Sequence, residues 1–435
     1  MASMSSPGAM GSAARGDSPR ERIETIAIVG ANIGGASTAE ALRRAGYDGR
    51  LTLIGAEPDL PYERPPLSKE FLTGQVDTSR LTLRPRAFYE EQGIELWLGQ
   101  RATALDAATR TLTLANGERH RFDRIALATG SELLPLPVPG ADLPGVHYLR
   151  TLADGQALLA ALQTGASRGG RVVVIGAGFI GSEVAAGCRM AGMAVTLIEM
   201  LATPLERALG PEMGALLAAV HRAHGVEVRT GETVAAIRGQ GRAEEVMTGS
   251  GAHIPCDFVV VGAGVRPATN WLADSGLALA NGVVVDATCA TSAPGVFAAG
   301  DVANWPYQPN ERAPLLRVRL EHWDNALRQG ETVARNLLGE GVAYRHIPYF
   351  WSDQYDLKLQ YVGYTPTWDR VVLRGDPPDS FVAFYLLAGR VRAAFSSNRQ
   401  RELVTLKKLV GAHPLAPPEL LADDARPLKE LLKLV

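Results

Sequence analysis

The sequence predicts an α/β protein of roughly two or three domains. At 435 residues the chain is too long for a single hydrophobic core of ordinary size. A unit made of a strand, a glycine-rich turn, a helix, a second strand and an acidic residue also occurs twice along it. Helices that alternate with strands in this way are typical of parallel sheets covered by helices on both faces.

The first copy of the unit is centred on the sequence GANIGG at residues 30–35. A strand is predicted over 26–29, a helix over 36–44, and a second strand over 51–54 that leads to Glu57. The glycines allow a tight turn and let backbone N–H groups at the helix start approach a pyrophosphate, where the helix dipole favours negative charge. This context predicts a dinucleotide site, although such glycines can also serve only to pack a helix on a strand.

The second copy is centred on GAGFIG at residues 176–181. A strand over 172–175 precedes it, and a helix from about 182 to 191 and a strand over 195–198 lead to Glu199. Each acid follows its turn at a distance suited to a pair of ribose hydroxyls. Two such units in one chain predict two bound nucleotides. The turn residues expected to lie beside the pyrophosphates are Gly30, Asn32, Gly35, Gly176, Gly178 and Gly181.

The first copy departs from the pattern at Asn32, which stands where the second glycine is expected. That glycine lets the backbone approach the pyrophosphate because it has no side chain. Asparagine tolerates unusual backbone angles better than most residues do. We therefore expect binding at this turn to be weakened or locally shifted, and we expect Asn32→Gly to tighten it.

Three further strand-like runs fit a protein with two nucleotides, the first two closing on glycine and the third ending in an acid. They cover residues 125–130, 258–267 and 295–301. Asp301 ends the last run and is expected to face a nucleotide, although aspartate is also a preferred helix cap. The candidate binding residues in these runs are Thr129, Gly130, Gly262, Gly300 and Asp301.

From residue 23 to the C-terminus, the sequence resembles the FAD-dependent ferredoxin reductase family, which supplies electrons to bacterial ring-hydroxylating dioxygenases and haem-thiolate monooxygenases. The resemblance rests on PYERPPLSK at 61–69, the Gly-Asp pair at 300–301, EHW at 321–323 and YFWSDQY at 349–355. It implies two Rossmann-like domains in a glutathione-reductase-like arrangement and a smaller C-terminal α/β domain. The implied domains are a split FAD domain at 23–132 and 264–338, an NADH domain at 133–263 and a C-terminal domain at 339–435.

The resemblance also implies roles for particular residues. Glu57 would bind the FAD ribose, Arg64 and Lys69 would lie by the flavin and phosphates, and Asp301 would hold the ribityl or pyrophosphate region. Glu199 would bind the adenosine ribose of NADH, and Glu183 would pair with Lys69 beside the flavin as the catalytic pair. The remaining implied flavin-side residues are Glu321, His322 and Trp323. Arg64 and Lys69 could instead be solvated loop charges, and Trp323 a core aromatic.

The implied activity is hydride transfer from NADH to FAD, followed by single-electron transfer to a [2Fe–2S] ferredoxin. A carboxylate at Glu199 accepts hydrogen bonds from a 2′-hydroxyl but repels a 2′-phosphate, which predicts a preference for NADH over NADPH. Two alternatives stay open on this scaffold. One is an NADH oxidase or quinone reductase, and the other is a slowly turning, NADH-sensing interaction protein such as the apoptosis-inducing-factor relatives.

The composition excludes several other classes of protein. A net charge of −2 provides no overall basic field for nucleic acid, and the apolar runs are too short to span a bilayer. The cysteines Cys188, Cys256 and Cys289 form neither a C-x-x-C nor a metal-ligand spacing, so no metal and no disulfide relay are expected. We expect a cytoplasmic enzyme with a disordered tail at 1–22, while the oligomeric state stays open.

Docking of an acidic ferredoxin would need a local basic surface, because the whole chain carries little charge. Arg317 and Arg319 precede the EHW sequence and are the first candidates, unless they simply point into solvent from a strand. The next candidates are Arg390, Arg392, Arg399 and Arg401.

Overall fold

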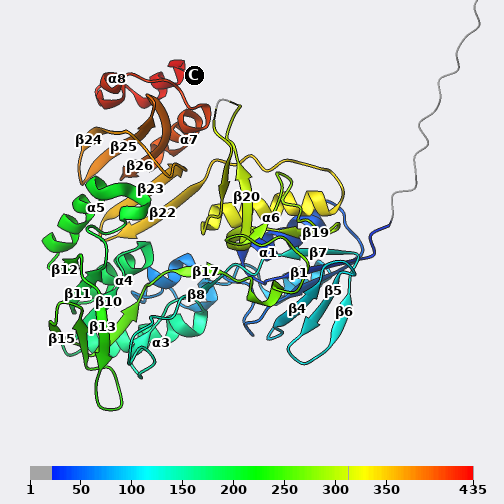
Figure 1. The fold of residues 1–435 in the computed structure, drawn as a ribbon, viewed down its shortest axis with the longest axis horizontal. Coiled ribbons are helices and arrows are strands. Elements are labelled where there is room, and N and C mark those ends of the chain that lie inside the picture. The colour runs from blue at the N-terminus through cyan, green and yellow to red at the C-terminus, as the bar shows by residue number, and fades with distance from the viewer. Residues whose placement is uncertain (1–21, 312, 435) are drawn as a thin grey trace, which may run out of the picture.

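The computed structural model describes residues 22–311 and 313–434, so the predicted tail lies outside the described residues except for Arg22. The described chain forms three lobes, each built on a five-stranded sheet (Figure 1). The first lobe contains β1 (Thr25–Val29) and α6 (Trp323–Leu337), the second contains β10 (Arg171–Ile175) and α4 (Phe179–Met190), and the third contains β26 (Arg390–Ser397) and α7 (Leu403–Ala412).

The first sheet is fully parallel, in the order β19–β7–β1–β2–β3. Its central strand is an unbroken apolar run with no exposed surface from Ile26 to Ile28, as expected for a strand covered on both faces. Helix α1 (Ile33–Arg44) follows β1 and packs against α6 (Trp323–Leu337). The strands are β1 (Thr25–Val29), β2 (Arg50–Ile54), β3 (Ile94–Trp97), β7 (Arg124–Leu127) and β19 (Val296–Ala298). β19 joins the first sheet although the second lobe lies between it and β7 in sequence.

The second sheet is also fully parallel, in the order β12–β11–β10–β16–β9. Helix α4 (Phe179–Met190) connects β10 to β11 and repeats the geometry of α1 in the first lobe. The strands are β9 (Val146–His147), β10 (Arg171–Ile175), β11 (Ala194–Glu199), β12 (Glu227–Thr230) and β16 (Phe258–Val261), and the other helices are α3 (Leu152–Ala166) and α5 (Glu206–Ala223).

The third sheet is antiparallel, in the order β22–β23–β26–β25–β24. One face packs against α7 (Leu403–Ala412), and the other packs against α5 of the second lobe. The strands are β22 (Tyr349–Gln354), β23 (Leu357–Gly363), β24 (Arg370–Asp376), β25 (Ser380–Leu387) and β26 (Arg390–Ser397), followed after α7 by α8 (Pro418–Ala422).

Short elements complete the fold. Strands β8 (Ser131–Leu133) and β17 (Val265–Pro267) pair antiparallel where the chain passes into and out of the second lobe. The others are α2 (Arg86–Glu91), β4 (Ala102–Asp106), β5 (Thr111–Leu114), β6 (Arg119–Arg121), β13 (Val234–Arg238), β14 (Glu245–Thr248), β15 (His253–Pro255), β18 (Val283–Val284), β20 (Ala303–Tyr307) and β21 (Leu316–Val318).

The predicted strands at the two glycine motifs are confirmed, but both helices begin earlier than expected. α1 begins at Ile33 and α4 at Phe179, each three residues before its predicted start. The third glycine of each motif therefore lies inside the first helical turn. A β-carbon on Gly35 would lie 1.8 Å from the carbonyl oxygen of Gly30, so only glycine lets the helix rest this close to the turn.

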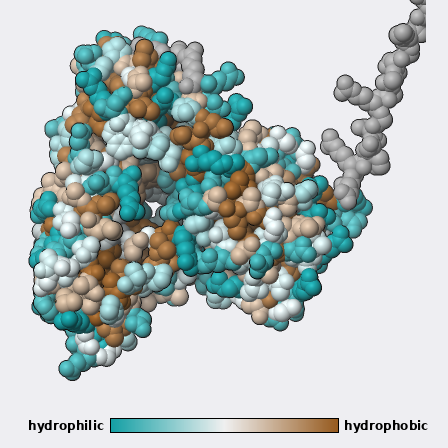
Figure 2. All heavy atoms as spheres, viewed as in Figure 1, coloured by the Kyte–Doolittle hydropathy of each residue, from teal (hydrophilic) through white to brown (hydrophobic). Residues whose placement is uncertain are grey.

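The surface seen in Figure 2 mixes polar and apolar residues and is hollowed where the three lobes meet. Within residues 22–311 and 313–434, no helix is long and apolar enough to cross a membrane. The same residues contain no group of three or more histidine, cysteine or acidic side chains that could hold a metal ion.

Candidate cofactor site

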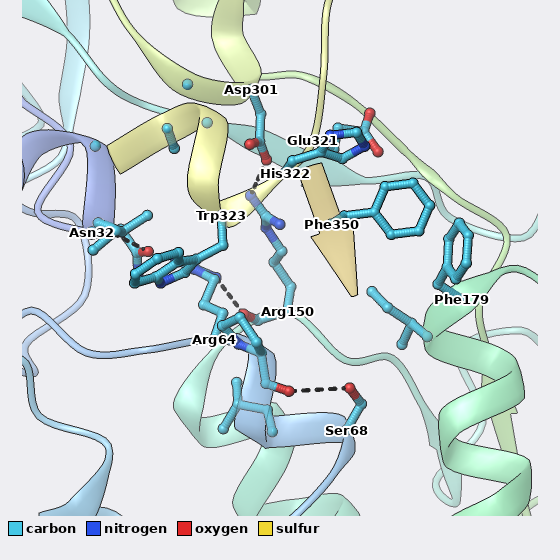
Figure 3. Close-up of a pocket in the computed structure, with 18 of the residues that line it drawn as sticks. Asn32, Arg64, Ser68, Arg150, Phe179, Asp301, Glu321, His322, Trp323 and Phe350 are labelled. Atoms are coloured by element: carbon cyan, nitrogen blue, oxygen red, sulfur yellow. Dashed lines mark hydrogen bonds and ion pairs between the residues drawn. The ribbon is translucent and has the colours of Figure 1, made fainter. Parts of the chain in front are cut away.

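Two adjoining pockets lie at the carboxyl end of the first sheet, where Asn32, Arg64, Ala128 and Thr129 line both of them. The first pocket receives residues from all three lobes (Figure 3). The predicted site residues that line it are Asn32, Arg64, Lys69, Thr129, Gly130, Glu183, Gly300, Asp301, Glu321, His322 and Trp323. Those that line the second are Gly30, Asn32, Glu57, Arg64 and Thr129. Those that line neither are Gly35, Gly176, Gly178, Gly181, Glu199 and Gly262.

Asn32 is the N-cap of α1, and its backbone is in the ordinary extended region. Its Oδ1 accepts a hydrogen bond of 2.9 Å from the backbone N–H of Ile33. No left-handed angle is demanded here, so the side chain causes no backbone strain. The side chain does, however, accept a hydrogen bond from a backbone N–H at the helix N-terminus, and this N–H could otherwise donate to a bound anion.

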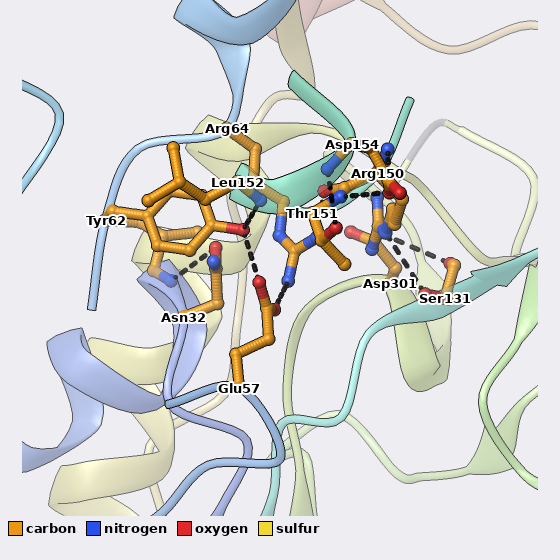
Figure 4. A network of polar contacts seen from close by, with 11 residues as sticks. Asn32, Glu57, Tyr62, Arg64, Ser131, Arg150, Thr151, Leu152, Asp154 and Asp301 are labelled. Carbon is orange, nitrogen blue, oxygen red and sulfur yellow. Dashed lines mark hydrogen bonds and ion pairs between the residues drawn. The ribbon is translucent and has the colours of Figure 1, made fainter. Parts of the chain in front are cut away.

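Glu57 holds a small network at the second pocket (Figure 4). The hydroxyl of Tyr62 donates to Glu57 Oε2 at 2.6 Å, and Arg64 Nη2 donates to Oε1 at 2.6 Å. Tyr62 also accepts from the backbone N–H of Leu152, and burial raises the pKa of its phenol. Arg64 is therefore an ion-pair partner at the pocket and not a solvated loop charge.

Asp301 lies in a short 3-10 helix directly after β19. Its Oδ2 accepts from Arg150 Nη2 at 3.1 Å and from the hydroxyl of Ser131 at 3.3 Å. Arg150 comes from the second lobe, and nothing in the sequence analysis singled it out. Asp301 is thus bound across the lobes and does not serve as a side-chain helix cap.

Of the two arginines suggested for docking, Arg317 is exposed and Arg319 is largely covered. The Arg319 side chain is 10% exposed, pairs with Glu321 at 2.7 Å and donates to the Asp301 carbonyl. Arg317 donates to the carbonyl oxygens of Val285 and Asn304. Arg319 is therefore not part of an exposed basic surface, whereas Arg317 stays exposed and docking at it stays a prediction.

Aromatic rings form one wall of the first pocket (Figure 3). Phe179, at the start of α4, lies 4.4 Å from Phe350 of β22, and His322 lies 4.7 Å from Phe350 between ring centroids. Burial lowers the pKa of His322 to about 4, so its imidazole is neutral at physiological pH. Trp323 lies 6.0 Å from Trp351, again between centroids.

Glu183 lies one helical turn after Phe179 in α4, lines the same pocket and is bound by groups from both other lobes. Lys69 Nζ lies 2.7 Å from its Oε2, and the two side chains are only 9% and 3% exposed. The hydroxyl of Ser68 donates to the same oxygen, and the hydroxyl of Ser352 donates to Oε1 at 2.6 Å. The structure therefore brings together the predicted pair Lys69 and Glu183 and adds two serines to it.

Glu199 ends β11 and is turned toward the second glycine turn. Its Oε2 accepts from the backbone N–H of Ala177 at 2.7 Å, and Oε1 accepts from that of Leu201 at 2.9 Å. Gly176 and Gly181 repeat the geometry of the first turn, and Gly262 packs against both. The predicted residues of the second unit thus lie together, apart from the two pockets.

The residues of the two pockets fit a flavin dinucleotide. Gly30 has a φ of +117°, and a β-carbon on it would lie 2.1 Å from the carbonyl oxygen of Ala128, so the fold itself requires glycine at the start of this turn. His322 Nδ1 and Trp323 Nε1 are buried and have no hydrogen-bond partner among the described residues. Buried polar atoms of this kind are normally satisfied, which fits a polar ring system bound against them.

A family model described as pyridine nucleotide-disulphide oxidoreductase matches residues 24–330, and one described as reductase C-terminal matches 349–432. The chain is 41% identical to a ferredoxin–NAD(P)+ reductase of a Sphingomonas species, over 94% of this chain and 97% of that protein. The chain belongs to this family of reductases. It is also 39% identical to rhodocoxin reductase of Rhodococcus erythropolis, over 93% of each protein.

A solved structure supports the same family. The chain matches the reductase in a covalent putidaredoxin reductase–putidaredoxin complex with a TM-score of 0.89 and 35% identity, over 94% of this chain and 98% of that one. The ferredoxin reductase family uses FAD and NAD(P)H, so this reductase is a flavin-dependent oxidoreductase. Its three cysteines are free and buried, and burial raises the pKa of the Cys188 thiol to about 12, which leaves it unreactive.

Proposed function

We propose that this reductase oxidises NADH through bound FAD and passes the electrons singly to a [2Fe–2S] ferredoxin that serves an oxygenase. The proposal rests on one observation, that the first turns of α4 line the first pocket. Phe179 and Glu183, which follow the second glycine turn, line the same cavity as Lys69 and Trp323. A nicotinamide held by the second unit would therefore reach a flavin held by the first.

Relatives with known partners support the ferredoxin acceptor. They include the reductase components of biphenyl and benzene dioxygenase systems, at 38% and 36% identity. We further propose the FAD domain at 23–132 and 264–338, the NADH domain at 133–263 and the C-terminal domain at 339–435. The membership of β19 in the first sheet supports the split of the FAD domain. A cytoplasmic location, where NADH is available, completes this proposal.

FAD supplies the hydride acceptor and the one-electron donor, so the protein needs to provide orientation and electrostatics more than acid or base chemistry. Gly30, Asn32 and Gly35 would hold the pyrophosphate at the N-terminus of α1. Glu57 would bind the FAD ribose while Tyr62 and Arg64 orient its carboxylate. The residues proposed along the flavin side are Arg64, Lys69, Thr129, Gly130, Gly300, Asp301, Glu321, His322 and Trp323.

The second unit would hold NADH. Gly176, Gly178 and Gly181 would receive its pyrophosphate, and Gly262 would support the turn. Glu199 would bind the adenosine ribose, which favours NADH over NADPH because its carboxylate repels a 2′-phosphate. Glu183 and Lys69 would set the position of the nicotinamide against the flavin, and neither is needed as a proton donor in turnover.

Reduction of cytochrome c, measured with and without an added [2Fe–2S] ferredoxin, tests the proposal. We expect NADH-dependent reduction that requires the ferredoxin, with lower catalytic efficiency for NADPH. Oxygen consumption without any protein acceptor would instead identify an oxidase. Very slow turnover with every acceptor would identify an NADH-sensing interaction protein.

A further inference from the structure

The carboxylate of Glu183 is bound unequally at its two oxygens. Lys69 and Ser68, both from the first lobe, donate to Oε2. Oε1 receives a hydrogen bond only from Ser352, at 2.6 Å, among the described residues. Because the terminal torsion of a glutamate is broad, donors on one oxygen alone leave the plane of the carboxylate free to turn. Ser352 therefore fixes the orientation of this group.

The hydroxyl of Ser352 is itself oriented by a neighbouring side chain of the same strand, Gln354. Ser352 and Gln354 both lie in β22 and have no exposed surface. Gln354 Nε2 donates to Ser352 Oγ at 3.2 Å. A serine hydroxyl has one proton to give, and a donor already bound to its oxygen leaves that proton for Glu183. The C-terminal lobe thus supplies an already oriented hydroxyl donor to Glu183 of the second lobe, which lines the first pocket.

We propose that Ser352 is a positioning residue for flavin reduction, which acts by holding Glu183, and through it Lys69, at one fixed orientation. The inference rests on the proposed function, since it concerns the step in which NADH reduces the flavin. It gives the C-terminal lobe a part in the hydride-transfer geometry, although that lobe carries neither glycine turn. Loss of the hydroxyl would also leave a buried carboxylate oxygen without a donor, which is costly.

Ser396 provides a matched control. It lies in β26 of the same sheet, has no exposed surface, and its hydroxyl has no hydrogen-bond partner among the described residues. Ser396→Ala therefore removes the same atom from the same sheet without touching Glu183. A general loss of packing in the C-terminal lobe would affect both variants, whereas positioning of Glu183 affects only Ser352→Ala.

The first experiment measures flavin reduction by NADH in the FAD-loaded enzyme by stopped flow. We expect Ser352→Ala to lower the rate at saturating NADH about tenfold, with little change in the NADH concentration for half-maximal rate. Ser396→Ala should stay within about twofold of the parent, since it removes no bond. Ser352→Thr, which keeps the hydroxyl, should recover most of the rate. Ser352→Cys, which keeps the volume but is a weak donor, should be as slow as the alanine variant.

The second experiment places Ser352→Ala in a Glu183→Met background, where the acceptor is gone. We expect no further slowing there, and thermal unfolding of the FAD-free protein should show the same non-additivity. Equal rates in parent, Ser352→Ala and Ser352→Cys would overturn the inference, as would full additivity with Glu183→Met. A parent enzyme whose flavin NADH does not reduce would instead overturn the proposed function.

Discussion

The two glycine turns have nearly the same backbone but differ at the position between their outer glycines. Gly30 and Gly176 both have positive φ angles, and a β-carbon on either would lie within 2.4 Å of a carbonyl oxygen across the sheet. The middle position, Asn32 in one and Gly178 in the other, is an extended helix cap in both. A β-carbon on Gly178 would contact nothing within 4 Å. The outer glycines are therefore required by the fold, and the middle one only by a ligand.

The helices after the turns differ in a second way. Glu183 and Ser37 occupy matching positions in α4 and α1, seven residues after the first glycine of each turn. Ser37 donates only to a carbonyl of its own helix, while Glu183 reaches Lys69 and Ser352 in the other two lobes. One unit is thus a plain nucleotide support, and the other also carries the group that joins the three lobes.

Alanine at an outer glycine should have the largest effect. Gly176→Ala is expected to lower the free energy of unfolding by about 3 kcal/mol, because the new methyl group meets backbone at a left-handed angle. Gly178→Ala should cost no more than about 1 kcal/mol, the usual effect at a helix cap, but should raise the NADH concentration for half-maximal rate. Denaturant unfolding of both variants measures the difference. Equal losses would remove the distinction between fold and ligand glycines.

Replacement of the charged pair should have the next largest effect. Glu183→Gln or Lys69→Met is expected to slow flavin reduction by NADH about 100-fold, the usual result of misplaced reacting groups. The double variant should cost less than the sum, because each single change leaves a buried group unpaired. Ser37→Ala, at the matching position of α1, is the control and should leave the rate unchanged. Strict additivity in stopped-flow rates would refute the pairing.

Sequence patterns succeeded where a contact is encoded locally. The strand, turn and helix of each unit follow from residues within about one helical turn of each other. The pairing of Lys69 with Glu183 could be predicted only through the family resemblance, because these residues are 114 positions apart. Arg150 gave no such signal, and Ser352, although it lies in the YFWSDQY motif, was assigned no role. They reach Asp301 and Glu183 over separations of 151 and 169 residues.

The error at Arg319 has a related cause. Alternation along a strand predicts which side chains leave the sheet face but not which loop covers them. Here Glu321 and the Asp301 carbonyl receive the guanidinium, so a charge that sequence analysis assigned to the surface is used inside. Arg399 of the second candidate cluster is likewise paired, with Asp424 at 2.9 Å. Arg390 and Arg392 both donate to His413, whereas Arg401 is exposed, so docking at this second cluster stays a prediction.

Replacement of Glu199 and of Glu57, the acids that end the second and the first unit, should affect different cofactors. Glu199→Ala is expected to lower the preference for NADH over NADPH about tenfold, since it removes a charge that repels the 2′-phosphate. Glu57→Ala should leave that preference unchanged and weaken FAD retention instead. Catalytic efficiencies with both nucleotides test this. A parent enzyme that uses NADPH as well as NADH, or an unaltered preference in Glu199→Ala, would contradict the assignment.

The smallest expected effect concerns Asn32. Asn32→Gly frees the N–H of Ile33 for the pyrophosphate, and a net hydrogen-bond contribution of about 1 kcal/mol is worth roughly fivefold in affinity. We therefore expect FAD to bind severalfold more tightly, while the FAD-free protein loses only a few tenths of a kcal/mol of stability. Asn32→Asp keeps an acceptor for the same N–H but adds negative charge, so it should bind FAD more weakly than the parent. The flavin retained after dialysis and the melting temperature of the FAD-free protein measure the two effects. If the glycine variant loses more FAD than the parent, the Asn32 amide itself contacts the cofactor, and the middle position of the first turn serves the ligand through its side chain.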